Sequence, residues 1–189
     1  MRLTPLTPDH LTPEQRVLYD AILGGPRGPG HTAEDGHLTG PFNAMLFNPP
    51  IGGPLQELGA AIRYEGSLEP VVRELAILTV AAAFRSEVEW HAHSRIAREL
   101  GVEAEVLDNI RRGVRPVLDG PKLEVLLEVA RALLDRTDVD DGLYERASSV
   151  AGEGGLVELT TLVGYYGILA TQLRLFRVPL PEGTLPVFE

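Results

Sequence analysis

Residues 73–93 read R-E-L-A-I-L-T-V-A-A-A-F-R-S-E-V-E-W-H-A-H and predict two successive helices. These helices place two carboxylates, Glu74 and Glu89, and the imidazole of His93 among Leu, Ile, Val and Trp side chains. An ionisable group in apolar surroundings is destabilising unless it is paired or neutral. Three such groups, close together in the sequence, therefore indicate a functional site.

The chain on either side of this stretch also reads as helix, and no segment shows the alternation of apolar and polar residues that is typical of a strand. Helices are expected at about 13–23, 51–65, 68–84, 86–100, 103–113, 121–136, 140–150 and 154–176. We therefore predict an all-α protein with a single domain over 1–189. Its parts are an N-terminal helix and Gly/Pro-rich loop in 1–50, a helical core in 51–177 and a C-terminal arm in 178–189.

The composition excludes several classes of partner and chemistry. The net charge is −10 and no Lys/Arg cluster is present, so nucleic acids and anionic membranes are poor partners. The longest apolar run, Leu75 to Phe84, is about half as long as a membrane span. The amino-terminal M-R-L-T-P-L-T-P-D-H lacks the apolar core of a signal peptide, and we expect a cytoplasmic protein. Because the chain has no cysteine, it has no disulfides, thiolate nucleophiles or Cys-ligated metals.

A helical wheel of residues 86–100, drawn at about 100° per residue, separates two faces. Glu89 and His93 fall in the apolar sector, with Ser86 at its edge. Glu87 and His91 fall on the opposite side, where we expect a solvated pair. An inward Glu89 is placed to fix the tautomer of His93 and to raise the pKa of its imidazole.

The same wheel argues against a metal site. His91 and His93 diverge by about 200° on a helix, so they cannot bind one ion within one subunit. Glu89 and His93 together supply two ligands, which is too few for a tight site. We expect no bound metal.

Glu74 has two interpretations. It lies near the start of the apolar helix, where a carboxylate favours the helix dipole while its head reaches water. Combined with an inward Glu89 and His93, it instead completes a set of groups that can hold and move a proton. We favour the second interpretation, because three ionisable groups on apolar faces are a stronger signal than one.

Several segments resemble one protein family. R-E-L-A-I-L at 73–78 and S-E-V-E-W-H-A-H-S-R-I-A-R-E-L-G at 86–101 are similar to the carboxymuconolactone decarboxylase family, within the AhpD-like (alkylhydroperoxidase-like) superfamily. The similarity extends to G-P-F-N-A-M-L-F-N-P at 40–49, Y-E-G-S-L at 64–68, L-V-G-Y-Y-G at 162–167 and V-P-L-P-E-G at 178–183. The resemblance implies an AhpD-like helical bundle with extended N- and C-terminal arms, assembled as a homo-oligomer of trimeric or hexameric type.

The superfamily has a peroxidase branch, in which a Glu, a C-x-x-C pair and a later His form a thiol relay. In this chain the matching positions are Glu74, then Ser86 and Glu89, then His93. A serine forms neither a sulfenic acid nor a disulfide, so thiol-dependent reduction of peroxides is excluded.

The resemblance to the decarboxylase branch implies a carbon-carbon lyase that removes CO2 from a carboxylated muconolactone in aromatic catabolism, with no metal or organic cofactor. His93 is then the proton donor, and Glu89 or Glu74 orients it and holds its charge. Side chains that we expect to contact the small-molecule substrate are Ser86, Trp90, Phe42 and Asn43.

Two other functions stay open. The same His/Glu set suits the hydrolysis or isomerisation of a lactone, and a non-catalytic helical oligomer suits the binding of a small ligand. A pH-rate profile controlled by His93 indicates an enzyme, whereas thermal stabilisation by a ligand without turnover indicates a binder. The sequence names neither the substrate nor the pathway.

Three segments outside this stretch carry further expectations. Residues 156–176 are apolar on most sides, which supports a homo-oligomer, and the Pro-rich arm at 179–189 has little to pack on within its own subunit. The Gly/Pro-rich segment 24–41 is predicted to be a mobile lid over the site. We expect His31 and His37 within it to be solvated loop histidines, with a role as additional proton carriers as the alternative. Phe42 and Asn43, directly after it, are expected in the pocket wall.

Overall fold

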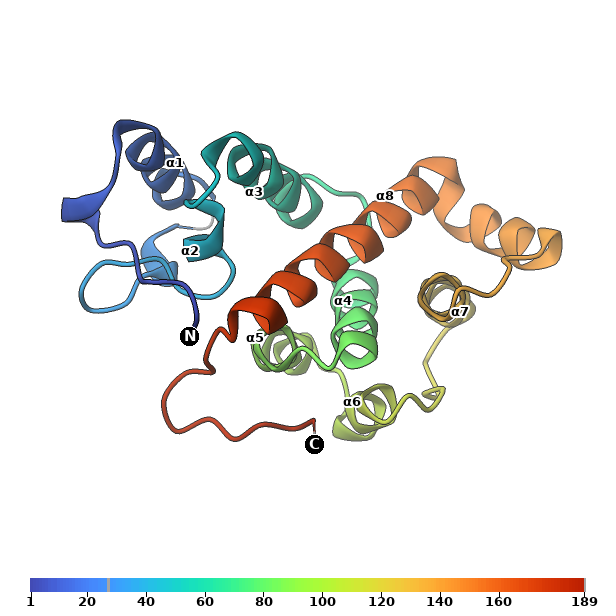
Figure 1. The fold of residues 1–189 in the computed structure, drawn as a ribbon. Coiled ribbons are helices and arrows are strands. Elements are labelled where there is room, and N and C mark those ends of the chain that lie inside the picture. Colours follow the sequence, from blue (N-terminus) through green and yellow to red (C-terminus); the bar gives the residue numbers. More distant parts are fainter. Residues whose placement is uncertain (27, 189) are drawn as a thin grey trace. The chain divides into compact units, whose positions relative to one another are not determined.

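The computed structural model describes residues 1–26 and 28–188, and this part of the chain folds as eight α-helices and two short 3-10 helices with no β-strand (Figure 1). The 3-10 helices are η1 (Pro8–His10) and η2 (Gly28–His31). The α-helices are α1 (Pro13–Gly24), α2 (Phe42–Met45), α3 (Pro49–Tyr64), α4 (Pro70–Phe84), α5 (Glu87–Glu99), α6 (Ala104–Arg111), α7 (Pro121–Asp135) and α8 (Asp141–Phe176). The predicted all-α fold is confirmed.

The chain divides into two compact units. The first consists of Met1–Gly66 with Gln172–Pro179, and the second of Ser67–Thr171 with Leu180–Glu189. The helix α3, expected in the core at 51–177, therefore belongs to the first unit, and the end of the C-terminal arm belongs to the second. The single domain over the whole chain stays a prediction.

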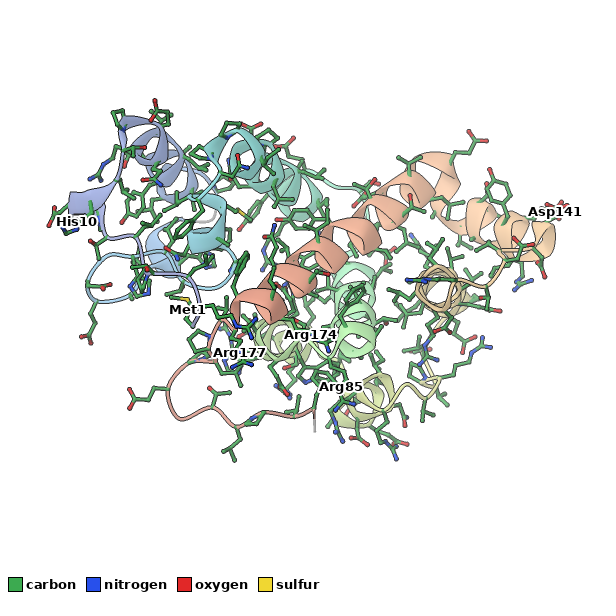
Figure 2. All side chains as sticks on the ribbon, viewed as in Figure 1. Met1, His10, Arg85, Asp141, Arg174 and Arg177 are labelled. Atoms are coloured by element: carbon green, nitrogen blue, oxygen red, sulfur yellow. The ribbon has the colours of Figure 1, made fainter. Side chains whose placement is uncertain are left out.

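The helix α4 is the centre of the second unit and packs against α5, α6 and α7. Its residues from Leu75 to Ala81 are all buried, because this helix is apolar on every side and has no face to offer to water. It ends at Arg85, which is labelled in Figure 2 and adopts the left-handed conformation with a φ of 53°. The chain then turns into α5, so the two helices predicted from residues 73–93 lie against each other.

The helix α8 joins two predicted helices, 140–150 and 154–176, across a kink. Gly152 has a φ of 68° and a ψ of 170°, which is not helical, and the bend is visible in Figure 1. A residue without a Cβ adopts this conformation at little cost. On the straight part that follows, Leu159 and Leu162 are buried, whereas Val157 and Ile168 are exposed. These exposed apolar side chains are compatible with the homo-oligomer, which stays a prediction.

The C-terminal arm packs on its own chain, contrary to expectation. The backbone N–H groups of Val187 and Phe188 donate hydrogen bonds to the carboxylate of Glu87, at 2.9 and 2.7 Å. The ring of Phe188 meets Trp90 edge-to-face, with 5.4 Å between ring centroids. Glu87 therefore holds the arm, and the predicted solvated pair of Glu87 with His91 is wrong. The arm has a partner because its apolar end finds the indole that α5 presents beside Glu87.

The first unit begins with a capped helix. Thr12 precedes α1, its hydroxyl accepts a hydrogen bond from the Gln15 N–H, and the Gln15 side chain accepts one from the Thr12 N–H. This reciprocal pair satisfies two of the free donors at the start of the helix.

The segment 24–41 is more ordered than its Gly/Pro content suggested. The Tyr19 hydroxyl donates to the carbonyl oxygen of Gly36 at 2.7 Å, and Leu38 is buried. The Thr39 N–H donates to the carbonyl oxygen of His31 at 2.8 Å, so the segment closes on itself as a loop. These contacts tie the loop to α1 and argue against the predicted mobility; Arg27, within it, lies outside the described residues. The predicted position over the site stays a prediction.

Two neighbouring glycines in α3 are expected to respond to substitution with opposite signs. A Cβ on Gly52 would lie 2.2 Å from the Met45 carbonyl oxygen, whereas a Cβ on Gly53 would meet nothing within 4 Å. Overpacking of this kind costs about 1–3 kcal/mol, and Ala is better than Gly in a helix by up to about 1 kcal/mol. In urea unfolding, Gly52→Ala should lower the free energy of unfolding and Gly53→Ala should raise it slightly. Equal effects would contradict the close approach of α2 to α3.

Among the described residues, no helix combines the length and the apolar character needed to cross a membrane.

Candidate active site

Two helices of the second unit bring together the three ionisable side chains singled out in the sequence. Glu74 lies one turn inside α4, and Glu89 and His93 lie one turn apart on α5, on the face that packs against α4. Because the chain reverses at Arg85 and Ser86, the inward face of α5 meets Glu74. The exposed fractions are 1% for Glu74, 5% for Glu89 and 6% for His93. We call these three side chains the buried triad.

The imidazole of His93 is held between the two carboxylates. Its Nδ1 lies 2.6 Å from Oε2 of Glu74, which is the distance of a strong charge-assisted hydrogen bond. Its Nε2 lies 3.4 Å from Oε2 of Glu89, a looser ion pair. Both ring nitrogens carry a proton when His93 is charged. Each N–H then donates toward one of the two carboxylates, which can only accept. His91 is exposed on the opposite face, as the wheel predicts.

The surroundings raise the pKa of His93 above its ordinary value of 6.5. Burial acts in the opposite direction and lowers the pKa, because an imidazolium loses its hydration. The hydrogen bonds with Glu74 and Glu89, and the charges of these two carboxylates, raise the pKa and outweigh burial. The site therefore favours a buried imidazolium, a group that can donate a proton at neutral pH.

The helix α8 contributes an aromatic wall that the sequence reasoning did not assign to the site. The ring of Tyr166 stands perpendicular to the imidazole of His93, with 5.2 Å between centroids. Tyr165 packs edge-to-face on Tyr166 at 5.2 Å, and both tyrosines are buried. Their position in L-V-G-Y-Y-G at 162–167 was a signal of resemblance, but nothing in one sequence pairs residue 166 with residue 93.

Of the other predicted site residues, Ser86 and Trp90 lie in the same unit as the triad. Ser86 occupies the N-cap position of α5, but its side chain makes no capping hydrogen bond. Its hydroxyl oxygen is buried and has no hydrogen-bond partner among the described residues. Trp90 is buried in the apolar cluster with Leu75 and Leu78, beneath Phe188. The Ser86 hydroxyl is thus available for a hydrogen bond to a ligand. Trp90 is buried by contacts within the protein, so its burial requires no ligand.

Phe42 and Asn43 belong to the first unit. The amide of Asn43 accepts a hydrogen bond from the Leu6 N–H at 2.9 Å and donates one to the Thr4 carbonyl oxygen at 3.2 Å. The ring of Phe42 lies 4.8 Å from that of His31, centroid to centroid. Asn43 therefore anchors the N-terminal segment, and a substrate contact from either residue stays a prediction.

The two loop histidines also lie in the first unit. His37 pairs with Asp35, two residues before it, in a solvent-accessible turn. His31 packs on Phe42. These local partners account for both imidazoles, and their role as proton carriers stays a prediction.

Arg73 is a second residue that the sequence reasoning left out. Its Nε lies 3.7 Å from Oε1 of Glu74, the oxygen that does not face His93. Its place directly before Glu74 was visible in R-E-L, but adjacent helical residues point in directions about 100° apart. Only the structure shows that the guanidinium turns back toward the carboxylate.

Among the described residues, no group of three or more His, Cys, Asp or Glu side chains is arranged to hold a metal ion. Two cavities of the second unit lie away from the buried triad. One of about 560 Å³ is lined by Arg115, Glu128 and Arg146 among others, and one of about 370 Å³ by Arg85, Arg111 and Arg131 among others. Neither is lined by a member of the buried triad.

Known families and structures agree with this architecture. Residues 49–132 match the model of the carboxymuconolactone decarboxylase family, and this segment contains the whole buried triad. No curated protein matches the chain closely enough to be counted as a relative.

Solved structures resemble the whole chain. An uncharacterized peroxidase-related protein from Ralstonia eutropha JMP134, described as an alkylhydroperoxidase AhpD core, superposes with a TM-score of 0.74 at 13% identity, covering 96% of this chain and 92% of that one. A peroxidase-related protein from Silicibacter sp. TM1040 gives 0.71 at 14% identity, covering 94% and 90%. The debrominase Bmp8, as a Cys-to-Ala variant in complex with 2,3,4-tribromopyrrole, gives 0.70 at 13% identity, covering 96% and 92%.

At these identities the neighbours establish the fold, and their activities remain their own. The family match and the presence of enzymes among the neighbours support an enzyme-like role at the level of the family. Residues 49–132 are thus similar to the carboxymuconolactone decarboxylase family, and the chain has an AhpD-like helical fold.

Proposed function

We propose that the protein is a cofactor-independent decarboxylase that acts on a small carboxylated lactone by proton transfer from His93. The observation that carries this proposal is the imidazole of His93, buried and held between Glu74 and Glu89 with a raised pKa. A charged imidazole that is buried beside two carboxylates holds a proton that it can donate to a substrate. A reaction that needs one proton delivered to carbon, and no redox or nucleophilic group, fits these residues best.

The chemistry of such a substrate requires little from the protein. In an unsaturated five-membered lactone with a carboxylate on the ring carbon next to the ring oxygen, the bond to the carboxylate breaks and CO2 leaves. The electron pair enters the conjugated C=C–C=O system and forms a dienolate, so the substrate is its own electron sink. A proton then adds to the carbon next to the lactone carbonyl and gives an enol-lactone. The imidazole regains its proton from solvent.

The geometry suggests a role for each member of the buried triad. Glu74 holds Nδ1 of His93 at 2.6 Å, which fixes the ring and leaves Nε2 to donate the proton. Glu89, at 3.4 Å from Nε2, stabilises the imidazolium before transfer. Its looser contact leaves this proton available to a substrate carbon.

Two further side chains support the same step. The ring of Tyr166 packs perpendicular to the imidazole of His93 and shields it from water. The buried hydroxyl of Ser86, which has no hydrogen-bond partner in the described part of the chain, offers a hydrogen bond to a substrate oxygen. A polar group in this state is better satisfied with a ligand present.

The proposal is tested by incubating the purified protein with an unsaturated γ-lactone that carries a carboxylate at the γ carbon. We expect CO2 release and appearance of the enol-lactone, with a chelator present and no cofactor added. Ring opening without CO2 release would instead identify a lactone hydrolase. Thermal stabilisation by the lactone without any turnover would identify a binding protein. Either result would overturn the decarboxylase assignment.

A further inference from the structure

The cavity of about 370 Å³ in the second unit lies where three helices end. Its lining comes from the C-terminal ends of α4, α6 and α7 and from the residues directly after α4 and α6. Arg85, which is labelled in Figure 2 at the end of α4, is one of the lining residues. We call this space the arginine cavity.

Positive charge is concentrated around the arginine cavity. Asp135 lines it, and Asp108 pairs with two of the lining arginines, at 2.7 and 3.0 Å. Four positive and two negative charges leave a sum of +2, although the whole chain carries −10. A local excess of this kind attracts an anion. The four arginines of the lining are Arg85, Arg111, Arg112 and Arg131.

These arginines have donors that the protein does not use. The side chain of Arg85 forms no hydrogen bond or ion pair with any described residue. Arg131 donates from Nη2 to the carbonyl oxygen of Val114 at 2.7 Å, and a guanidinium has five N–H donors. Burial lowers the pKa of Arg131 below its ordinary value, while the charge of Asp135 raises it. A guanidinium that has lost part of its hydration interacts more strongly with an anion than one in bulk water.

Arginines at the end of a helix can also serve to satisfy the last carbonyl oxygens. Here the backbone already does so. The carbonyl oxygens of Ala81 and Ala82 in α4 accept hydrogen bonds from the N–H groups of Ser86 and Arg85. Those of residues 108–110 in α6 likewise accept from backbone N–H groups. The guanidinium groups are therefore not required as caps and are available to a ligand.

The interior of the arginine cavity is apolar. Ile110 is buried, and Ala82 and Leu134 are half-buried, whereas Arg85 and Arg112 are exposed. The apolar side chains therefore form the floor and the guanidinium groups the rim. A volume of about 370 Å³ is within the range of sites for small metabolites. A ligand in this space would place carbon atoms on the floor and oxygen anions at the rim.

We propose that the arginine cavity binds a small organic dianion, such as a phosphate monoester or a dicarboxylate, with a compact apolar body. A ligand charge of −2 balances the local sum of +2. The planar guanidinium binds carboxylate and phosphate oxygens through paired donors. The site is independent of the proposed function, because no member of the buried triad lines this cavity.

The inference is tested by calorimetry on the full chain, with phenyl phosphate as the probe. At about pH 8 phenyl phosphate is a dianion, since the second pKa of a phosphate monoester is about 6. Inorganic phosphate supplies the charge without the ring, and benzyl alcohol supplies the ring without the charge. We expect phenyl phosphate to bind at least about tenfold more tightly than either. Phthalate distinguishes the two kinds of dianion: tighter binding than phenyl phosphate indicates a dicarboxylate, and weaker binding a phosphate monoester.

Variants of the rim show whether the probe occupies this cavity. Arg85→Gln and Arg131→Gln should each weaken binding of phenyl phosphate by about tenfold, because each removes a charge-assisted hydrogen bond. Arg136→Gln is the matched control: Arg136 also follows a helix in the left-handed conformation, with a φ of 56°, but does not line the cavity. It should change the affinity by about twofold or less, since exposed charges act weakly over distance in salt. Circular dichroism verifies that each variant is folded.

Three results would overturn the inference. The first is that phenyl phosphate binds no more tightly than benzyl alcohol, since the arginines would then contribute nothing. The second is unchanged affinity in both Arg85→Gln and Arg131→Gln. The third is an equal loss in Arg136→Gln, which would mean that the general charge of the surface attracts the probe and the cavity does not.

Discussion

Replacement of His93 by Gln is expected to lower the rate of decarboxylation by about 10²–10⁴-fold, the range that general acid catalysis contributes. Glutamine has nearly the shape and hydrogen-bonding reach of histidine, but its amide gives up no proton at neutral pH. The buried space beside Glu74 and Tyr166 therefore stays filled while the proton donor is lost. The measurement is kcat/KM for CO2 release, with circular dichroism and the melting temperature to verify the fold.

His91→Gln is the matched control on the same helix. His91 is exposed and two residues from His93, so the same substitution there changes neither the triad nor the core. We expect nearly full activity. If His91→Gln proved the more damaging change in a folded protein, the two faces of α5 would have been assigned backwards and the site would lie on the opposite side of the helix.

The pH dependence should have a defined direction. The acid form of His93 is the active one, and its pKa lies above 6.5. Activity should therefore persist above pH 6.5 and decline as the pH rises through the raised pKa of His93. Without the hydrogen bonds and charges of Glu74 and Glu89, burial would lower the pKa of His93 below 6.5, and activity would decline at lower pH.

The helices of this fold could be predicted because their signals are local. The apolar run from Leu75 to Phe84 needs burial on all sides, and the wheel of residues 86–100 has one inward and one outward face. Two such helices in succession pack on each other when the turn between them is short. From this alone, Glu74 and the inward face with Glu89 and His93 could be expected to meet.

What escaped prediction depends on residues that are distant in sequence. Tyr166 reaches His93 from α8, 73 positions further along the chain, and Glu87 receives the arm through Val187 and Phe188. Local patterns contain no information on such pairs. Composition misled in the segment 24–41, because a loop rich in Gly and Pro is still held when one buried leucine and one tyrosine hydroxyl anchor it.

Replacement of Glu74 by Gln is expected to be the most destabilising of the conservative changes at the site. It leaves the imidazolium of His93 buried with only the looser partner Glu89, and removal of one member of a buried ion pair costs about 3–5 kcal/mol. Burial lowers the pKa of His93, and in this variant only Glu89 still raises it, so the pKa of His93 should fall. Urea unfolding measures the loss, and the NMR titration of the His93 ring protons follows the pKa.

The pH dependence of this loss distinguishes the ion pair from a packing defect. A folded pKa above the unfolded value of 6.5 means that the contribution of His93 to stability is fully present below about pH 6.5 and is lost as the pH rises through the raised pKa. The destabilisation by Glu74→Gln should therefore be larger at about pH 5 than at about pH 9, on either side of the ordinary range for histidine. It should also be much smaller in a His93→Gln background, since coupled partners are not additive. Glu87→Gln, which weakens only the hold on the C-terminal arm, should show neither behaviour. A loss of equal size at both pH values would mean that Glu74 acts by filling space, and the stored proton at His93 would then lack its main support.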